Sequence, residues 1–468
     1  MAIPKALVSR QMIKQMDGIK SIRTTLQPAN SSGVQSFSAN SNNKIIFQIP
    51  QYPNAFINTK RSYIRFKVKS GSADDNLHDG CPIFRRMVLK NTRTTLEDID
   101  NYDVLCKIME DFKTTEETKT LSYTHKVQKG LENATFEKQK AKEQALLNSD
   151  GQNVVHELHS GILGHYQEYL VPVHSLSAQS GYAMQLELYL NDNNKVFYKT
   201  TSTSNGAAPP VYTQNASGSY TVSDVAFELE LVELPTNVLA DINRELASGG
   251  EIPLPFKTWR NQTVALSGSG TKHQMLLQES AINVENILTV IKNQSHSAIV
   301  SAGTTLSTNE IRSSVNDPNS FYGGRYERSG ATSTQTTNYL KKYSIRYGST
   351  YYPSSPVDLD CDSVLALENL LSTMDMNDEN RPIITEIDPD TGVPRYESTD
   401  FIIGHSFKTT KDPLMNGLNS GSTGAPLEIT FEFNGNPNAT SAKEVQAFIQ
   451  QTNTLFVKAN GLSSVTQG

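Results

Sequence analysis

The stretch from Tyr182 to Asp192, YAMQLELYLND, alternates apolar and polar side chains, and a closely similar stretch, APLEITFEFNG, returns between Ala425 and Gly435. Strict alternation predicts a half-buried β-strand, because successive side chains of a strand point to opposite faces. The side chains predicted to point inward are Met184, Leu186, Leu188 and Leu190 in the first stretch and Leu427, Ile429, Phe431 and Phe433 in the second. Two such strands in distant parts of one chain indicate an internal repeat.

The order of features around these strands supports the repeat. Each half of the chain runs through strands, a helix-favouring stretch and more strands, and each has a His-Ser pair and a Gly/Ser loop before the alternating strand. Many short strands separated by polar turns predict two antiparallel β-sandwiches. We expect an arm over residues 1–40, a first sandwich over 41–245 with a helical insertion near 97–148, and a second over 246–468 with an insertion near 361–375.

Further strands are predicted wherever a period-2 pattern is bounded by Pro, Asn or Gly. These segments are 44–50, 60–69, 166–176, 220–234, 272–280, 285–293, 339–353, 401–410 and 453–461. The Gly249–Gly250 pair with Pro253 and Pro255 indicates the boundary between the two units.

Length and composition limit the function classes. The 468 residues suit two domains and an arm, taking about 100–200 residues per domain. A net charge of −6 argues against a surface that binds nucleic acid as a whole. Three cysteines without a CxxC spacing, Cys81, Cys106 and Cys361, argue against a disulfide framework and suit a reducing compartment. Six Asn-x-Ser/Thr sites are then chance matches in an Asn-, Ser- and Thr-rich chain.

Targeting signals are not recognised in the sequence. The first 20 residues contain no apolar core of a signal peptide, and no run of 18 or more apolar residues occurs. We therefore expect neither secretion nor a membrane span.

The arm carries the clearest interaction signal. It is basic and has apolar residues at helical spacing, which would share one helix face. The candidate contact residues are Lys5, Arg10, Met12, Ile13, Lys14, Met16, Ile19 and Lys20. The alternatives are a disordered tail or a segment that folds on a neighbouring subunit, a membrane surface or nucleic acid. A subunit or a membrane is favoured because the basic density is modest.

Motifs for catalysis, metals and phosphate do not pass their spacing rules. His156 and His159 in HELH lie three apart, whereas a zinc-binding helix needs four. The acidic runs at 358–362 and 388–390 lack the spacing of a calcium loop and are interpreted as a helix start and a turn. The Gly/Ser run at 266–270 has no Lys-Ser/Thr after it, so it is a flexible turn and no P-loop. We expect no catalytic, cofactor or metal site.

Acidic residues occupy the outward positions of several alternating strands. They are Glu187, Glu228, Glu230, Glu428 and Glu432. We expect them to be solvated or to contact a neighbouring subunit, although a glycosidase carboxylate pair, distant in sequence, stays open. Trp259 is the one tryptophan, which argues mildly against a carbohydrate-binding cleft.

Several of these stretches resemble the double jelly-roll major capsid proteins. They are residues 45–68, the helical insertion, VAFELELVEL at 225–234, and the pieces FIIGH, GLNSG and LEITFEF of the second half. This lineage includes tectivirus coat proteins, adenovirus hexon and the capsid proteins of virophages and Polinton-like viruses, and the last two are most similar. The likeness covers residues 40–460. It rests on the order of the segments along the chain and on their alternating residue patterns. The compact loops differ from the larger towers of hexon.

The resemblance implies a mainly β chain of two tandem eight-stranded antiparallel jelly-roll sandwiches with short helical insertions. It also implies a non-enzymatic capsid protein without cofactors, which forms pseudo-hexameric homotrimers that tile an icosahedral shell. Implied partners are neighbouring capsomers, minor capsid or penton proteins and an internal membrane reached by the arm, with no specific nucleic acid. The implied location is the virion, after synthesis in the host cytoplasm and assembly there or in the nucleus. The alternative is a secreted or surface β-sandwich that binds or hydrolyses glycans, which should show a signal peptide, paired cysteines or exposed aromatic residues.

Overall fold

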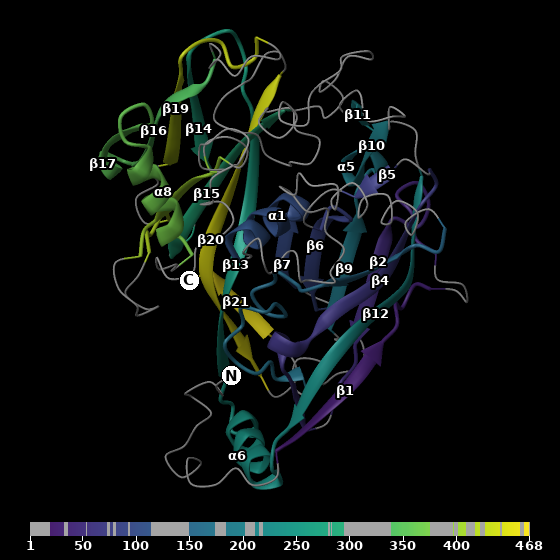
Figure 1. The fold of residues 1–468 in the computed structure, drawn as a ribbon. Helices are drawn as coiled ribbons and strands as arrows, with labels where there is room; N and C mark the ends of the chain where they lie inside the picture. Colours follow the sequence, from purple (N-terminus) through teal and green to yellow (C-terminus); the bar gives the residue numbers. More distant parts are fainter. Residues whose placement is uncertain are drawn as a thin grey trace.

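Two eight-stranded β-sandwiches lie next to one another in the computed structural model of the chain (Figure 1). The structure describes residues 19–31, 36–52, 54–72, 75–77, 81–91, 94–113, 149–173, 184–201, 211–214, 219–278, 281, 283–293, 338–374, 396, 401–408, 417–421, 426–439, 442–458 and 463–467. The two sandwiches are called the first roll and the second roll below.

The first roll consists of two antiparallel sheets. One has the order β1-β12-β4-β8, formed by Lys20–Leu26, Tyr220–Glu233, Tyr63–Ser70 and Gln152–His156. The other has the order β2-β9-β6-β7, formed by Lys44–Ile49, Met184–Leu190, Phe84–Lys90 and Thr95–Asp100. The short strand β3, Ala55–Ile57, also pairs with β12, and a small separate sheet joins β5 (Asp75–Leu77), β10 (Phe197–Thr201) and β11 (Val211–Gln214).

The second roll repeats this arrangement. Its sheets have the orders β13-β20-β15-β18, formed by Ile252–Ala265, Lys443–Val457, Val284–Asn293 and Ile403–Ser406, and β14-β19-β16-β17, formed by Lys272–Leu277, Leu427–Phe433, Leu340–Tyr347 and Thr350–Asp358. β21, Ser463–Gln467, pairs with the end of β20. When the eight main strands of each roll are counted along the chain, both rolls have the orders 1-8-3-6 and 2-7-4-5. The predicted fold class and the internal repeat are confirmed.

The two alternating stretches occupy equivalent places in the two rolls. β9 and β19 are each the seventh strand, and each lies inside its sheet between two partners. Leu186 pairs with Phe47 and Leu89, and Ile429 pairs with Met275 and Ile345. All these side chains are buried, so the inward positions predicted from the alternation are confirmed.

The two long helices that follow a fifth strand are also equivalent. α1, Tyr102–Lys113, follows β7, and α8, Ser363–Ser372, follows β17. Asp362 caps α8 by accepting a hydrogen bond from the backbone N–H of Leu365 at 3.2 Å, as expected for an acid at a helix start. The insertion predicted near 97–148 is corrected at its start, since Thr95–Asp100 is β7; residues 114–148 lie outside the described part.

The arm predicted over residues 1–40 is also corrected, because Lys20–Leu26 forms β1, the first strand of the first roll. Its sequence, KSIRTTL, has one apolar residue in its first six positions and gives no clear alternation. β1 is an edge strand paired with β12 alone, and most of its side chains are exposed. A strand that buries so little needs no regular apolar face.

Two other predictions from the sequence differ from the structure. Residues 166–176 contain no named strand in their described part, 166–173; Val171 makes an isolated bridge to Ile57. A helix that was not predicted, α6 (Thr236–Ala247), connects β12 to β13, so the predicted boundary at 245/246 falls within it. Figure 1 shows α6 at the lower end of the molecule. No helix among the described residues is long and apolar enough to cross a membrane.

Gly404 lets α8 lie directly on the sheet of the second roll. A Cβ atom at this position of β18 would lie 2.6 Å from Cδ1 and 2.7 Å from Cα of Leu370. Leu370 and Ala366 are the buried side chains of α8, so the helix is held against β18 through this contact.

We expect Gly404→Ala to lower the free energy of unfolding by about 1–3 kcal/mol, since the helix must move away from the sheet. The measurement is urea unfolding followed by circular dichroism. Gly270→Ala is the matched control: the nearest atom to its added Cβ is 3.8 Å away, so we expect a change within about 0.5 kcal/mol. Equal effects of the two substitutions would contradict this contact.

Candidate functional site at the junction of the two rolls

The helix α1 is buried between the two rolls from Tyr102 to Met109. Tyr102, Leu105, Lys107 and Phe112 are fully buried, and every other described side chain from Asp103 to Met109 is buried as well. The burial of the charged residues Asp103 and Lys107 together with the apolar ones shows that the helix is enclosed and does not lie on a surface. α1 packs on β6 of its own roll and faces β13 and β20 of the other (Figure 1).

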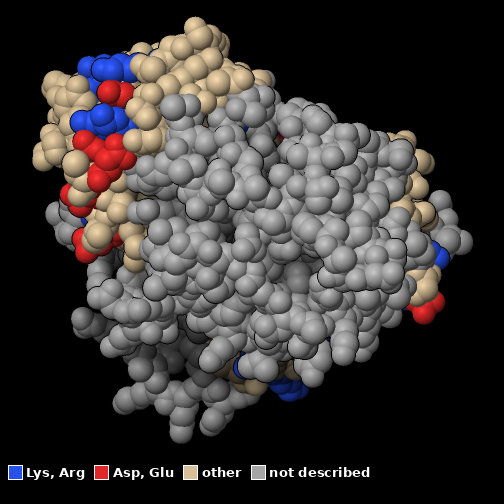
Figure 2. All heavy atoms as spheres, turned by 45° about the horizontal axis from the view of Figure 1, so that its top comes forward, with Lys and Arg blue, Asp and Glu red and all other residues tan. Residues whose placement is uncertain are grey.

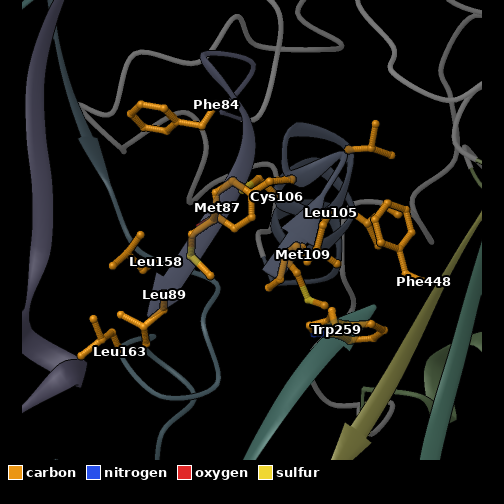
Figure 3. Packing of buried hydrophobic residues seen from close by; sticks show 14 of the residues in the cluster. Phe84, Met87, Leu89, Leu105, Cys106, Met109, Leu158, Leu163, Trp259 and Phe448 are labelled. Atoms are coloured by element: carbon orange, nitrogen blue, oxygen red, sulfur yellow. The ribbon is translucent and has the colours of Figure 1, made fainter. Parts of the chain in front are cut away.

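Apolar contacts connect α1 to the second roll. Figure 3 shows Leu105 and Met109 on the side of α1 that faces Phe448 and Trp259, and all four belong to one buried cluster. Phe448 and Trp259 lie on the outer face of their sheet, the face turned away from the interior of the second roll, because Ile449 beside Phe448 points inward. This sheet is therefore buried on both faces.

Polar contacts cross the same junction. The side-chain amide of Asn101 donates to Oδ1 of Asn261 at 2.8 Å, and the amide of Gln167 donates to the carbonyl oxygen of Pro255 at 3.3 Å. A Cβ atom added to Gly161 would lie 2.1 Å from the carbonyl oxygen of Lys257. The two rolls are in close backbone contact here and form a single body.

Glu97 fixes the loop that touches the second roll. Its carboxylate accepts hydrogen bonds from the hydroxyl of Ser160 and from the backbone N–H groups of Gly161 and Ile162, the latter two at 2.7 and 3.2 Å. Burial raises the pKa of Glu97, and these hydrogen bonds oppose that shift. Glu97 lies on β7, so it connects the loop to the strand that precedes α1.

Opposite charges from the two rolls meet at the junction. Asp103 at the start of α1 accepts a hydrogen bond from the side-chain amide of Asn191 at 2.8 Å, and Lys292 on β15 lies 3.4 Å from the carboxylate of Glu444. Burial raises the pKa of Asp103, which the charges of Lys292 and Lys195 oppose. Burial lowers the pKa of Lys292, which Asp103 and Glu444 oppose. Both shifts follow from the loss of water where the rolls meet.

The outer face of the sheet β2-β9-β6-β7 carries a ladder of ion pairs. Glu187 on β9 pairs with Lys44 on β2 at 2.6 Å and with Lys90 on β6, and Arg86 pairs with Asp98 at 2.5 Å. Burial opposes ionisation of Glu187, but hydrogen bonds from the two lysines outweigh it and lower its pKa. The strand positions are polar, yet their charges are paired between neighbouring strands.

The corresponding sheet of the second roll carries a similar ladder. Glu428 on β19 pairs with Arg346 on β16 at 2.7 Å, and Lys342 pairs with Asp358 at 2.8 Å. Hydrogen bonds with Arg346, Gln274 and Thr430 lower the pKa of Glu428 against the opposing effect of burial. Figure 2 shows acidic and basic side chains next to one another on the described surface at its left.

The outward glutamates were predicted to be solvated or to contact a neighbouring subunit, and solvation is wrong for three of the five. Glu187, Glu230 and Glu428 are buried beneath their partners, whereas Glu228 and Glu432 remain partly exposed. Glu230 accepts a hydrogen bond from the hydroxyl of Ser21 at 2.5 Å. Side chains from neighbouring strands cover these carboxylates, and the alternation within one strand cannot reveal that cover.

The structure places two of the predicted arm contacts. Lys20 is the exposed first residue of β1, and Ile19, directly before it, is exposed to 45%. The other six, Lys5, Arg10, Met12, Ile13, Lys14 and Met16, lie outside the described residues. Their contacts stay predictions.

The histidines of HELH contact an aromatic side chain of α1. The hydroxyl of Tyr102 lies 3.0 Å from Nε2 of His156 and accepts a hydrogen bond from the backbone N–H of His159 at 2.9 Å. The described residues contain no group of three or more His, Cys, Asp or Glu placed to hold a metal ion. Cys81 and Cys106 are buried, and Cys361 is exposed.

The sequence interpretation missed the burial of α1 at the junction. The stretch YDVLCKIMEDF places Asp103, Lys107 and Glu110 on one side of a helix, which predicts an amphipathic helix with one buried face and gives no sign that the other side is covered too. Its partners Trp259 and Phe448 carry no local signal, since each lies at a strand position that looks outward within its own roll.

Comparison with known proteins gives a likeness of fold over the whole chain. The chain is similar to PBCV-1 VP54, fitted into a reconstruction of the virophage Sputnik, with a TM-score of 0.57, 10% identity and coverage of 96% of this chain and 97% of that chain. The Faustovirus major capsid protein gives a TM-score of 0.54, 9% identity and coverage of 94% and 91%. The Sputnik virophage structure gives 0.52, 10% identity and coverage of 96% and 88%. No family model and no curated protein matches the chain.

The chain has the double jelly-roll fold. The resemblance noted from the sequence is thereby confirmed for the fold, with both rolls included in the match. At about 10% identity the match rests on the strand order and the helices, because few side chains are shared.

We expect Met109→Ala to lower the free energy of unfolding by about 2–5 kcal/mol, because it leaves a cavity between α1 and the second roll. It should also shift the native fluorescence of Trp259, the one tryptophan of the chain. Met275→Ala is the matched control, since Met275 is equally buried but lies on β14. We expect the control to be destabilised with native emission unchanged; equal emission spectra for both variants would contradict the contact with Trp259.

We expect Glu187→Gln to lower the free energy of unfolding at neutral pH by about 1–2 kcal/mol. The free energy of unfolding should also change less with pH in the acid range. The pKa of Glu187 is lowered in the folded state, so its stabilisation is present above the ordinary value of 4.5 and is lost as the pH falls through the lower folded value. Urea unfolding between pH 3 and 7 measures both effects. Glu432→Gln is the control, because its pair with Lys272 at 3.4 Å is exposed and should contribute little.

Proposed function

We propose that this protein is a viral major capsid protein whose homotrimers, with a pseudo-hexameric outline, tile an icosahedral shell. The observation that carries the proposal is the duplicated roll: both halves have the orders 1-8-3-6 and 2-7-4-5, and a buried helix fixes them together. Three chains of two similar rolls supply six similar walls, as a closed symmetric ring of identical chains requires. The Faustovirus relative is itself a major capsid protein, and the likeness spans most of both chains.

The role is structural and non-enzymatic in this proposal. The described residues contain no metal cluster, and the paired carboxylates of the outer faces have basic partners. The partners are neighbouring capsomers, minor capsid or penton proteins and an internal membrane reached by the first residues of the chain. The location is the virion, with synthesis in the host cytoplasm and assembly in the cytoplasm or nucleus.

The ion-pair ladders support self-association over glycan hydrolysis. A glycosidase needs two carboxylates free to act as acid and as base or nucleophile in one cleft. Glu187 and Glu428 belong to different rolls, and each is held by basic side chains of its own sheet. A surface of paired charges stays hydrated in the free protein and can still be covered by another protein on association.

The purified chain should sediment at three times its mass of 51.7 kDa at micromolar concentration and appear as hexagonal outlines in electron micrographs. An interface of well over about 2,000 Å² is expected for such an obligate assembly, so the trimer should survive dilution. A stable monomer that cleaves a glycan would overturn the proposal in favour of a glycan-acting sandwich.

A further inference from the structure

The edges of the sheets differ in how open they are to pairing with another chain. An edge strand presents a row of backbone N–H and C=O groups without partners, and stable proteins cover, shorten or interrupt such strands. The edge strands of the four main sheets are β1, β8, β2, β7, β13, β18, β14 and β17. Six of them, all except β1 and β8, are covered or interrupted within the described part of the chain.

Side-chain amides cover the free edges of β2 and β14. The amide of Asn30 donates to the carbonyl oxygen of Lys44 at 2.6 Å, and its Oδ1 accepts from the backbone N–H of Ile46 at 3.1 Å. The amide of Gln262 donates to the carbonyl oxygen of Leu276 on β14 at 2.6 Å. A strand that approached either edge would have to displace these amides.

Four further edges are blocked by packing or by proline. β7 and β13 lie against each other at the junction of the two rolls. β18 has only four residues and packs against α8. β17 contains Pro353 and Pro356, which have no backbone N–H to donate to another strand.

β1 has an open and regular edge. All seven of its residues pair with β12 without a bulge, and it contains no proline or glycine. No described residue outside β12 forms a hydrogen bond with its backbone. Figure 1 shows β1 at the border of the molecule, beside β12. β8, at the opposite edge of the same sheet, is shorter, with five residues.

The side chains of β1 define the chemistry of a matching strand. On the outer face of the sheet, Arg23 is exposed, and its guanidinium lies 5.9 Å from the ring centre of Tyr63. On the inner face, Ile22 is 45% exposed although it pairs with the buried Leu231, because no described strand lies beyond it. A matching strand would place an acid opposite Arg23 and an apolar residue opposite Ile22.

β12 meets these demands on the edge that is already paired, with Glu230 opposite Arg23 and Leu231 opposite Ile22. Opposite residues of neighbouring strands lie on the same face whichever edge is used, so an antiparallel strand with the same alternation suits the free edge. β1 has no acidic residue, and two copies of β1 paired antiparallel about Arg23 would bring equal charges together. Self-pairing is therefore disfavoured, and a different, acidic strand is favoured.

We propose that the free edge of β1 binds an extended segment of another protein, in which acidic and apolar side chains alternate. The segment adds a strand to the sheet β1-β12-β4-β8 by antiparallel backbone pairing. The backbone groups supply affinity, and the alternation of side chains supplies specificity. The site goes beyond the proposed capsid function, since one chain provides all of it and each chain binds one segment.

The probe for this site is a synthetic peptide with the sequence of residues 226–234, AFELELVEL, which already has the required alternation. The measurement is amide hydrogen exchange of the full chain with and without the peptide. We expect one peptide per chain and at least about tenfold slower exchange within Lys20–Leu26. The same peptide N-methylated at its three central residues keeps its side chains but loses the N–H groups that pair, and it should not bind.

Two variants separate the charged and the apolar part of the contact. Arg23→Gln should weaken peptide binding about tenfold and reduce the dependence of the affinity on salt. Ile22→Ser should weaken binding and leave the salt dependence unchanged. Lys69→Gln is the matched control, because Lys69 is an exposed residue of β4 in the same sheet but lies away from the edge, and the affinity should stay within about twofold. Far-ultraviolet circular dichroism confirms that each variant is folded.

Three outcomes would overturn the inference. They are unchanged exchange at Lys20–Leu26 with millimolar peptide, equal binding by the N-methylated peptide, and protection of Lys20–Leu26 that rises with protein concentration alone. The last result would assign the edge to a second copy of the chain. The capsid proposal is tested separately by the mass of the wild-type protein, so it stands or falls without this site.

Discussion

The burial of α1 between the two rolls is the constraint on which the rest of the structure depends. The helix buries its apolar face together with Asp103 and Lys107, and Trp259 and Phe448 from the other roll cover the side that carries Leu105 and Met109. Burying a large apolar side chain contributes about 1.5–3 kcal/mol, so a few such contacts stabilise the junction by as much as a small domain's whole stability. The rolls therefore hold one fixed relation.

The buried polar groups at this junction depend on the same contact. Asp103 and Lys292 come from different rolls, and each loses its water because the rolls meet. If the rolls were apart, Asp103 and Lys292 would both be hydrated. If the rolls were only partly separated, one charge would stay buried without the opposite charge that compensates it, which is costly. Arrangements in which the two rolls are partly separated are therefore disfavoured. The hydrogen bonds from Asn101 to Asn261 and Thr263 fix the orientation of the two rolls at this contact.

The sequence predicted the repeat, the mainly β fold class and both helices that follow a fifth strand, because each of these elements shows its residue periodicity within a short stretch of sequence. It missed β1 and the cover over Glu187, and both failures have the same cause. β1 is a strand only because β12 pairs with it, although about 200 residues separate them. Lys44 likewise reaches Glu187 from a neighbouring strand that lies far away in the sequence. Trp259 was interpreted only as the one tryptophan of the chain, which argued mildly against a carbohydrate-binding cleft, yet it packs at the junction against α1 of the other roll. Long-range pairing leaves no trace in a window of ten residues.

The two rolls share one strand order but differ on the outer faces of their 1-8-3-6 sheets, and this asymmetry separates folding from association. If both faces carried large apolar side chains such as Trp259 and Phe448, the free chain would expose those of the first roll and would aggregate. If both were charged like the one with Arg23 and Arg65, nothing would fix the rolls to each other within a chain. With one of each, the apolar face is covered during folding, and the charged face remains soluble.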